Sequence, residues 1–297
     1  HFDHIGLGGP GSGSRKPDSV QVHPGADDNG SGTAGLLELA QKLSSNKNRL
    51  KRSFLLVGFD AEEKGLLGSK HFVENSPVDI KDIVSMINMD MIGRMVDSSF
   101  TVSGVGTSPS FELLLDSLKT NRPFNLIIDK PGFGPSDHAS FYTKDIPVLF
   151  FFSGIHDDYH TPLDIWQRIN LKGEKYILDF IYDVVFDLSR SSIRPTFQKA
   201  GPKNNQMGSP RRFSVTLGII PSYTSIKKGL EIDGISNSDG PAAKAGMKKG
   251  DVIKSIDNKP ISNIYDYMDR LSNLKSETTI PIIIERNEQK KVLQVTF

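Results

Sequence analysis

Apolar positions follow two patterns over about the first 190 residues. Some short segments are apolar at nearly every position, which is typical of parallel strands covered on both faces. These segments are residues 53–59, 83–89 and 147–152. Elsewhere apolar residues recur at helical spacing, at Leu36, Leu37, Ala40 and Leu43 and along residues 171–188. Alternating strands and amphipathic helices predict an α/β fold, a three-layer sandwich on a mainly parallel (mixed) sheet.

The pattern changes after residue 190. Residues 191–228 contain no Asp or Glu but seven Lys or Arg. Within them, residues 191–212 are rich in Pro, Gly, Asn and Ser, which favours a solvated basic linker over a site for an anionic partner. Residues 213–297 then show short strands punctuated by Gly and Pro, with one helix at about 264–274. They predict a second, small and mostly-β domain.

Composition narrows the classes of function. A length of 297 residues suits two domains, and a formal net charge of +1 offers no strong field for nucleic acid. No apolar run approaches the roughly 20 residues of a transmembrane segment. Because the chain has no Cys, it can form neither disulfides nor thiolate metal sites. A bound metal would need His, Asp and Glu ligands.

Acidic residues and His gather where predicted strands end. Three groups follow the three strands in order: DAEE at 60–63, Asp90, and YHTP at 159–162. Ligands bind outside the carboxyl ends of strands in open α/β sheets, so these groups should converge. HFDH at 1–4 and GADDNGSG at 25–32 add to them. Each motif alone is weak, but together they would leave several carboxylates without a neutralising charge, which indicates a metal site.

The ordered motifs HxD, GADDNGSG, DAEEKGLLGS, NMDMIGR and YHTPLD resemble the M28 family of co-catalytic zinc aminopeptidases. The resemblance covers residues 1–190 and implies a metallopeptidase catalytic domain with two Zn²⁺ ions. By motif, His1, Asp28 and Asp90 hold one zinc, and Asp28, Glu63 and His160 hold the other. The shared Asp28 carboxylate offsets the repulsion between two cations about 3.5–4 Å apart.

The same resemblance implies roles for neighbouring residues. Glu62 would be the general base, moving a proton from a metal-bridged water to the leaving amine. Tyr159 stands where some members use a hydroxyl against the developing oxyanion, and a structural Tyr is the alternative. Asp3 would accept a hydrogen bond from the His1 ring nitrogen that is not on the metal. The peptide bond after Asp28 would be cis.

The remaining histidines have weaker assignments. Asp137 and His138 resemble a segment that lies behind the ligands in the family. His4, His23 and His71 are expected to be structural or exposed.

Residues 213–297 resemble a bacterial-type PDZ domain, chiefly through GPAAKAGMKKGDVI at 240–253. Leu217, Gly218 and Ile219 look like its carboxylate-binding loop, where a C-terminal peptide would bind by strand addition. A domain that folds but binds nothing is the alternative.

The leading interpretation is an aminopeptidase acting on peptide substrates. A carboxypeptidase or dipeptidase of the same fold stays open, because no specificity pocket is legible. A glutaminyl-cyclase-like single-zinc enzyme and an inactive binding scaffold rank lower, since all five ligands and Glu62 are present. We expect a periplasmic, secreted or cell-envelope location in a bacterium. We also expect the targeting signal, and the strand that delivers His1, to precede this sequence.

Overall fold

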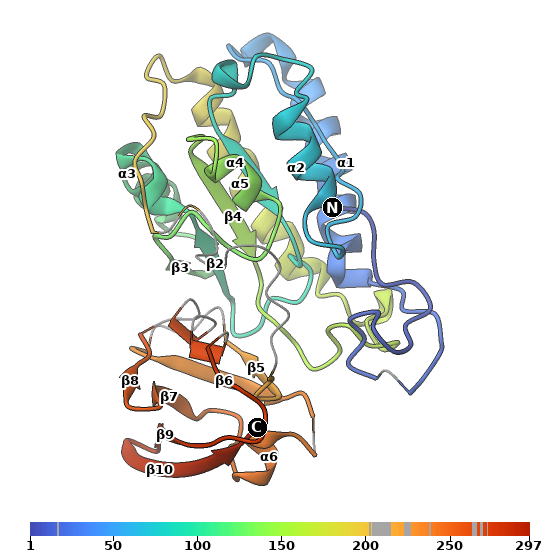
Figure 1. Ribbon diagram of the computed structural model, residues 1–297. Coiled ribbons are helices and arrows are strands. Elements are labelled where there is room, and N and C mark those ends of the chain that lie inside the picture. The colour runs from blue at the N-terminus through green and yellow to red at the C-terminus, as the bar shows by residue number, and fades with distance from the viewer. Residues whose placement is uncertain are drawn as a thin grey trace. The chain divides into compact units, whose positions relative to one another are not determined.

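Two compact units, residues 1–203 and 204–297, make up the chain in a computed structural model (Figure 1). The structure describes residues 1–16, 18–201, 203, 215–222, 227–237, 239–262, 266–267, 270–271 and 273–297. In this part of the chain, no helix combines the length and the apolar character needed to cross a bilayer.

The first unit is built on a mixed four-stranded sheet. Its strands are β1 (Met86–Met89), β2 (Ser99–Ser103), β3 (Asn125–Ile128) and β4 (Val148–Phe152). They lie in the order β1-β4-β2-β3. β1 pairs with β4 and β2 with β3 in parallel, whereas β2 and β4 are antiparallel. The predicted mixed sheet is therefore confirmed.

Helices connect these strands. The α-helices are α1 (Gly32–Ser45), α2 (Leu67–Glu74), α3 (Pro109–Lys119), α4 (His138–Tyr142) and α5 (Leu171–Arg190). A turn labelled η1 (Ala26–Ser31), in which Asp28 and Asn29 have non-helical backbone angles, precedes α1. Short 3₁₀ turns lie at Lys47–Arg49, Ile80–Asp82, Val105–Thr107 and Trp166–Arg168.

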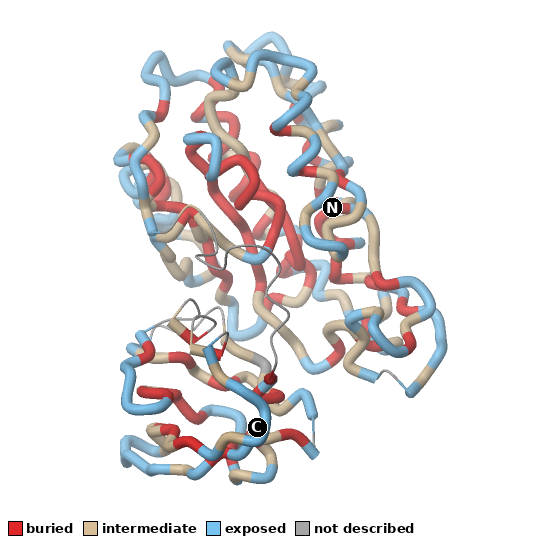
Figure 2. Tube along the Cα trace, in the orientation of Figure 1, coloured by how far each residue is buried: buried red, intermediate tan, exposed pale blue. Residues whose placement is uncertain are grey.

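Strand β4 shows why the unit has three layers. All five of its residues are buried, and they form the red centre of the unit in Figure 2. Leu149 and Phe151 pack in one core with α1, α3 and α5, while Val148 packs in another with α2 and α4. Successive side chains of a strand point to opposite faces, so each face of β4 is covered by helices. The predicted three-layer arrangement follows.

The predicted strand at residues 53–59 is wrong. No strand is formed there, and its backbone contact with the N-terminal segment is the Phe2 N–H donating to the Phe59 carbonyl. Leu55 and Leu56 are 55% and 44% exposed, so the run is not covered on both faces. An apolar run fixes which residues prefer burial, but a strand also needs a hydrogen-bonding neighbour, and pairing partners cannot be read from one segment.

The described part of the predicted linker packs on the first unit. The Gln198 N–H donates to the Thr107 carbonyl, and the Ala200 N–H donates to the Tyr142 hydroxyl. Residues 204–212 of the predicted linker lie outside the described residues.

The second unit is a small antiparallel sheet with its own core. Its strands are β5 (Ile219–Pro221), β6 (Leu230–Ile235), β7 (Val252–Ile256), β8 (Lys259–Pro260), β9 (Thr279–Arg286) and β10 (Gln289–Thr296). The order is β10-β9-β7-β6-β5, β8 pairs with β7, and a short helix α6 spans Pro241–Lys244. Five of the eleven residues of the predicted helix at 264–274 lie outside the described residues.

Candidate active site

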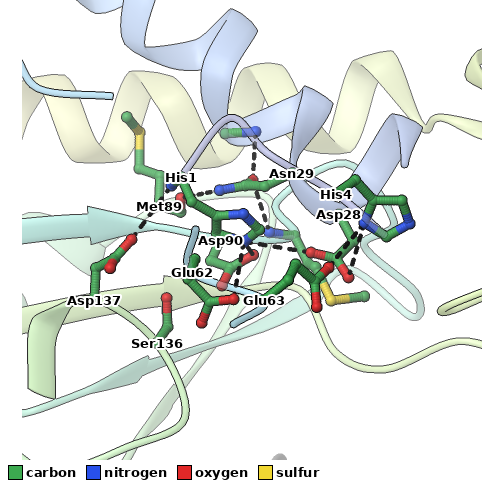
Figure 3. A network of polar contacts seen from close by, with 12 residues as sticks. His1, His4, Asp28, Asn29, Glu62, Glu63, Met89, Asp90, Ser136 and Asp137 are labelled. Atoms are coloured by element: carbon green, nitrogen blue, oxygen red, sulfur yellow. Dashed lines mark hydrogen bonds and ion pairs between the residues drawn. The ribbon is translucent and has the colours of Figure 1, made fainter. Parts of the chain in front are cut away.

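Carboxylates and imidazoles from distant parts of the chain meet beside the first sheet, as Figure 3 shows. Asp90 directly follows β1, and Glu62 and Glu63 follow the extended segment 53–59. Asp28 comes from the turn η1 before α1, and His1 from the first residue of the chain. The acidic residues and histidines that the sequence places in separate motifs therefore lie close together in the structure.

One half of the cluster surrounds the His1 ring. Its Nε2 atom lies 3.2 Å from Asp90 Oδ1, 3.4 Å from Asp28 Oδ1 and 3.9 Å from Glu62 Oε2. Its Nδ1 atom donates to the Asp3 main-chain carbonyl at 3.1 Å. This bond puts a proton on Nδ1, so Nε2 is the nitrogen that faces the carboxylates, where it donates to Asp90 Oδ1 at 3.2 Å.

The other half surrounds His160. Its Nε2 atom lies 3.1 Å from Asp28 Oδ2 and 3.2 Å from Glu63 Oε2. Its Nδ1 atom donates to the Gly13 carbonyl at 3.0 Å, so again Nε2 is the nitrogen that faces the carboxylates. The two oxygens of Asp28 therefore face two different imidazoles.

The backbone holds Asp28 in place. Asp164 accepts the N–H groups of Asp27 and Asp28, with nitrogen–oxygen distances of 3.0–3.1 Å. The peptide bond between Asp28 and Asn29 is cis. The Asn29 side chain donates to the Met89 carbonyl, which ties the turn to β1.

The Asp3 carboxylate does not accept the predicted hydrogen bond from the His1 ring. Its carboxylate is 3.6 Å from His1 Nδ1, and the ring donates to the Asp3 carbonyl instead. The carboxylate accepts the backbone N–H of Glu62 at 3.1 Å and of Glu63 at 3.4 Å. Asp3 thereby fixes the turn that carries both glutamates, because two N–H donors outcompete one ring nitrogen already satisfied by a carbonyl.

Burial and charge shift the acid–base properties of the cluster. Burial lowers the pKa of His1, but the carboxylates of Asp90 and Asp28 outweigh it and raise that pKa to about 12. Burial also lowers the pKa of His160, but hydrogen bonds and charge from Asp28 and Glu63 outweigh it and raise that pKa to about 10. Burial, together with the Asp90 charge, raises the pKa of Glu62 to about 9. Excess negative charge is thus confined in a poorly solvated site.

The donor atoms fit a bound metal ion. His1, Glu62 and Asp90 each place one ligand atom within 4.8 Å of the others. Buried Asp28 Oδ2, Glu63 Oε1 and His160 Nε2 have no hydrogen-bond partner among the described residues. Unsatisfied buried polar atoms are costly, and a cation would satisfy them. Carboxylate oxygen and imidazole nitrogen without thiolate are donors that zinc accepts.

Sequence reasoning missed His4. The structure places its Nδ1 atom 2.9 Å from Glu63 Oε1 and 3.7 Å from Asp28 Oδ2, with the ring edge-to-face against His160. The spacing HxDH was the available signal, because a residue three positions after His1 shares the loop that enters the site.

Other predicted residues lie around the cluster. The Tyr159 ring stacks on His160, with ring centroids 3.9 Å apart. Asp137 Oδ2 lies 3.5 Å from the His1 backbone nitrogen. The fully buried His138 stacks on Phe150 and has no hydrogen bond with any described residue. His138 therefore lies behind the site and does not face it.

The predicted peptide-binding loop of the second unit precedes an outer strand. Leu217 is fully buried, and Gly218 adopts a φ of 78°, which favours glycine. Ile219 begins β5, which pairs with β6 and ends the strand order of the described sheet.

Comparison with known proteins agrees with both units. Residues 1–185 match peptidase family M28, and residues 222–297 match the PDZ domain. Aminopeptidase YwaD of Bacillus subtilis is 30% identical over 193 residues, covering 60% of this chain and 41% of that protein. Leupeptin-inactivating enzyme 1 of Streptomyces exfoliatus is 36% identical over 138 residues, covering 46% of this chain and 31% of that protein.

A solved structure also resembles the first unit. The Legionella pneumophila LapA aminopeptidase is 27% identical, with a TM-score of 0.50. The match covers 58% of this chain and 49% of that one. The chain thus spans half or less of the length of these relatives.

Proposed function

Because the chain belongs to peptidase family M28, we propose that it is a two-zinc aminopeptidase that removes N-terminal residues from peptides. The observation that carries the proposal is the position of Asp28. Its two oxygens face His1 Nε2 and His160 Nε2 at 3.4 and 3.1 Å, as a carboxylate shared by two metal ions requires. Two of the relatives, Aminopeptidase YwaD and the LapA aminopeptidase, are named as aminopeptidases.

The ligand sets are those implied by the family resemblance, and these contacts support them. His1, Asp28 and Asp90 would hold one Zn²⁺, and Asp28, Glu63 and His160 the other. When bound, the two ions would supply a polarised, more acidic water and a Lewis acid for the scissile carbonyl. The Nδ1–H bonds of His1 and His160 to main-chain carbonyls keep both Nε2 atoms available as ligands.

Glu62 would move the proton. Its carboxylate lies 3.9 Å from His1 Nε2, and its backbone N–H is held by Asp3. The raised pKa of Glu62 belongs to the metal-free site, and bound cations would lower it. As a base, Glu62 would take a proton from the attacking water and return it to the leaving amine. Ionised Glu62 and Asp90 would also provide negative charge for the free ammonium group of a substrate, which favours an aminopeptidase. A carboxypeptidase or dipeptidase would need a cation for the substrate carboxylate.

Glu62→Gln tests this assignment. The amide keeps the size of the side chain but cannot accept the proton, so we expect two zinc ions to remain bound while kcat on leucine p-nitroanilide falls about 10²–10⁴-fold. Full activity in Glu62→Gln contradicts the role of Glu62. Cleavage of peptides blocked at the N-terminus, at the rate of free peptides, contradicts the aminopeptidase assignment.

The second unit would bind peptides. β5 lies at the end of the strand order, so a peptide C-terminus could pair beside Ile219 while the backbone of Leu217 and Gly218 receives its carboxylate. Binding of a C-terminal peptide library to the full chain, and loss of binding after amidation of the peptides, is the expected result. Failure of all peptides to bind supports a purely structural unit.

The location outside the cytoplasm is also a proposal. A periplasmic, secreted or cell-envelope protein should be recovered in the extracytoplasmic fraction when the parent gene is expressed, whereas recovery with the cytoplasm contradicts it.

A further inference from the structure

His4 is a buried imidazole that points at the carboxylates of the site. Its side chain is only 9% exposed, and neither ring nitrogen has a hydrogen-bond partner among the described residues. Figure 3 shows the ring beside Asp28 and Glu63, across the cluster from Asp137. A buried imidazole without partners loses its hydration and gains nothing in return unless something else satisfies it.

The contacts of His4 are not those of an ordinary hydrogen bond. Nδ1 lies 2.9 Å from Glu63 Oε1, yet both atoms remain without a hydrogen bond. Nearby, Asp28 Oδ2 and His160 Nε2 are unsatisfied in the same way. Four buried nitrogen or oxygen atoms, one each from His4, Asp28, Glu63 and His160, thus lie near one another without well-aligned hydrogen bonds. This is the arrangement expected of atoms that share a central ion.

The distances agree with a shared ion. Two donor atoms about 2.0–2.1 Å from one zinc, separated by angles of about 90–130°, lie about 2.9–3.7 Å apart. The four separations between the two imidazoles and the two carboxylates run from 2.9 to 3.7 Å, with His4 Nδ1 facing Oε1 of Glu63 and His160 Nε2 facing Oε2. His4, Asp28 and Glu63 also offer one ligand atom each within 4.8 Å of one another.

The backbone leaves room for the ring in this position. Gly25 has a φ of 60°, and a Cβ built there would lie 2.6 Å from His4 Cγ. A side chain at residue 25 would therefore displace the imidazole. The turn that presents Asp28 and the ring of His4 fit together only because residue 25 is glycine.

We infer that His4 is a protein ligand, through Nδ1, of the metal ion held by Asp28, Glu63 and His160. The inference rests on the proposed two-metal site and adds a fourth donor to its second position. One metal would then have two imidazoles and two carboxylates, and the other one imidazole and two carboxylates. The two positions should differ in affinity, with the His4 position binding zinc more tightly.

His4→Phe tests the inference, because phenylalanine keeps the ring against His160 and Gly25 but removes both nitrogens. The experiment titrates the full chain with Zn²⁺ and Co²⁺ in competition with a chelator and records the visible spectrum of bound Co²⁺. We expect the tighter site to weaken by more than 100-fold and its Co²⁺ absorption to change, while the other site keeps its affinity. His71→Phe, at an exposed histidine, is the matched control.

The outcomes separate the two claims. If the unchanged chain binds fewer than two ions, the proposed two-metal site fails. If it binds two and His4→Phe binds both with unchanged affinity, only the inference fails. A loss of 10–100-fold without any change in the Co²⁺ spectrum also overturns it, since that is the effect of a residue that merely orients a ligand. Circular dichroism and Trp166 fluorescence identical to the unchanged chain exclude misfolding, and His4→Gln provides a second variant.

Discussion

Asp164 is the residue on which the position of the shared carboxylate depends. Its buried side chain accepts the N–H groups of Asp27 and Asp28, and so holds the turn from which the Asp28 carboxylate projects. A carboxylate is suited to this, because it is only an acceptor and both of its oxygens face donors. The position of Asp28, a proposed metal ligand, therefore depends on Asp164, which is not itself a proposed ligand.

Asp164→Asn should weaken zinc binding without unfolding the protein. The amide has the same shape but turns one acceptor into a donor that faces the backbone N–H groups, so we expect about 10–100-fold lower zinc affinity in a chelator competition. Asp97→Asn, on an exposed residue, should have no effect. Equal zinc affinities for Asp164→Asn and the unchanged chain would show that the turn carrying Asp28 keeps its conformation without the Asp164 carboxylate.

His138 makes the stability of the first unit depend on pH. Burial lowers its pKa to about 3, against about 6.5 in an unfolded chain. Below pH 6.5 the unfolded state therefore takes up a proton that the folded state refuses until about pH 3. The free energy of unfolding should fall through this window, at up to about 1.4 kcal/mol per pH unit from this group.

Urea unfolding followed by the fluorescence of Trp166, the one tryptophan of the chain, measures this effect. His138→Phe keeps a ring against Phe150 but cannot be protonated, so its stability should fall less steeply between pH 6.5 and 4.5. Parallel slopes for the two proteins would mean that His138 is not held neutral by the fold.

Single residues also show where sequence reasoning about the site reached its limit. The order of motifs, through the family resemblance, brought together His1, Asp28 and Asp90, of which only Asp90 follows a strand. The motif HxDH places His4 near His1 in the sequence but does not say whether its ring turns inward. Nor could it find the Gly13 carbonyl that orients His160, because any residue offers the same backbone oxygen.

At the scale of elements, helix α5 joins the layers of the first unit. Its stripe of Ile177, Phe180 and Ile181 is fully buried in the core shared with α1, α3 and β4. The helical spacing of these residues predicted α5 to within two residues at its end. A long amphipathic helix can be predicted from sequence because many apolar positions recur at helical spacing on the same buried face.

Short strands are harder to predict. β2 and β3 have five and four residues and were not predicted, while residues 53–59 were predicted as a strand and are not one. The order β1-β4-β2-β3 places β2 against β4 in the antiparallel sense. This pairing joins segments about 50 residues apart. The apolar pattern of one strand does not predict which other strand it pairs with.

Two substitutions on α5 separate packing from helix propensity. Ile177→Ala removes a fully buried side chain and should lower the free energy of unfolding of the first unit by about 2–5 kcal/mol. Leu171→Ala, on a residue that is 74% exposed, should change it by less than about 0.5 kcal/mol. Similar losses for both in urea unfolding would show that α5 does not form the core described.

At the scale of the whole molecule, the two units have separate hydrophobic cores, two in the first unit and one in the second. The core of the second unit includes Leu217, Ile232 and Ile282, and it shares no residue with the cores of the first unit. The change of composition after residue 190 predicted two domains, but it did not show that residues 194–201 pack on the first unit. That contact depends on Tyr142 and Thr107, which are distant in sequence.

The two units should unfold independently. Ile282→Ala removes a fully buried side chain from the second unit and should lower the midpoint of one calorimetric transition. The Trp166 fluorescence midpoint, which reports the first unit, should not move. A common shift of both would indicate a single cooperative molecule.

The zinc content of the purified full chain tests the central claim most directly. The account predicts two zinc ions per chain after dialysis, and at most one in Asp28→Asn, because the shared carboxylate serves both positions. One ion or none in the unchanged chain, or two in Asp28→Asn, would contradict it.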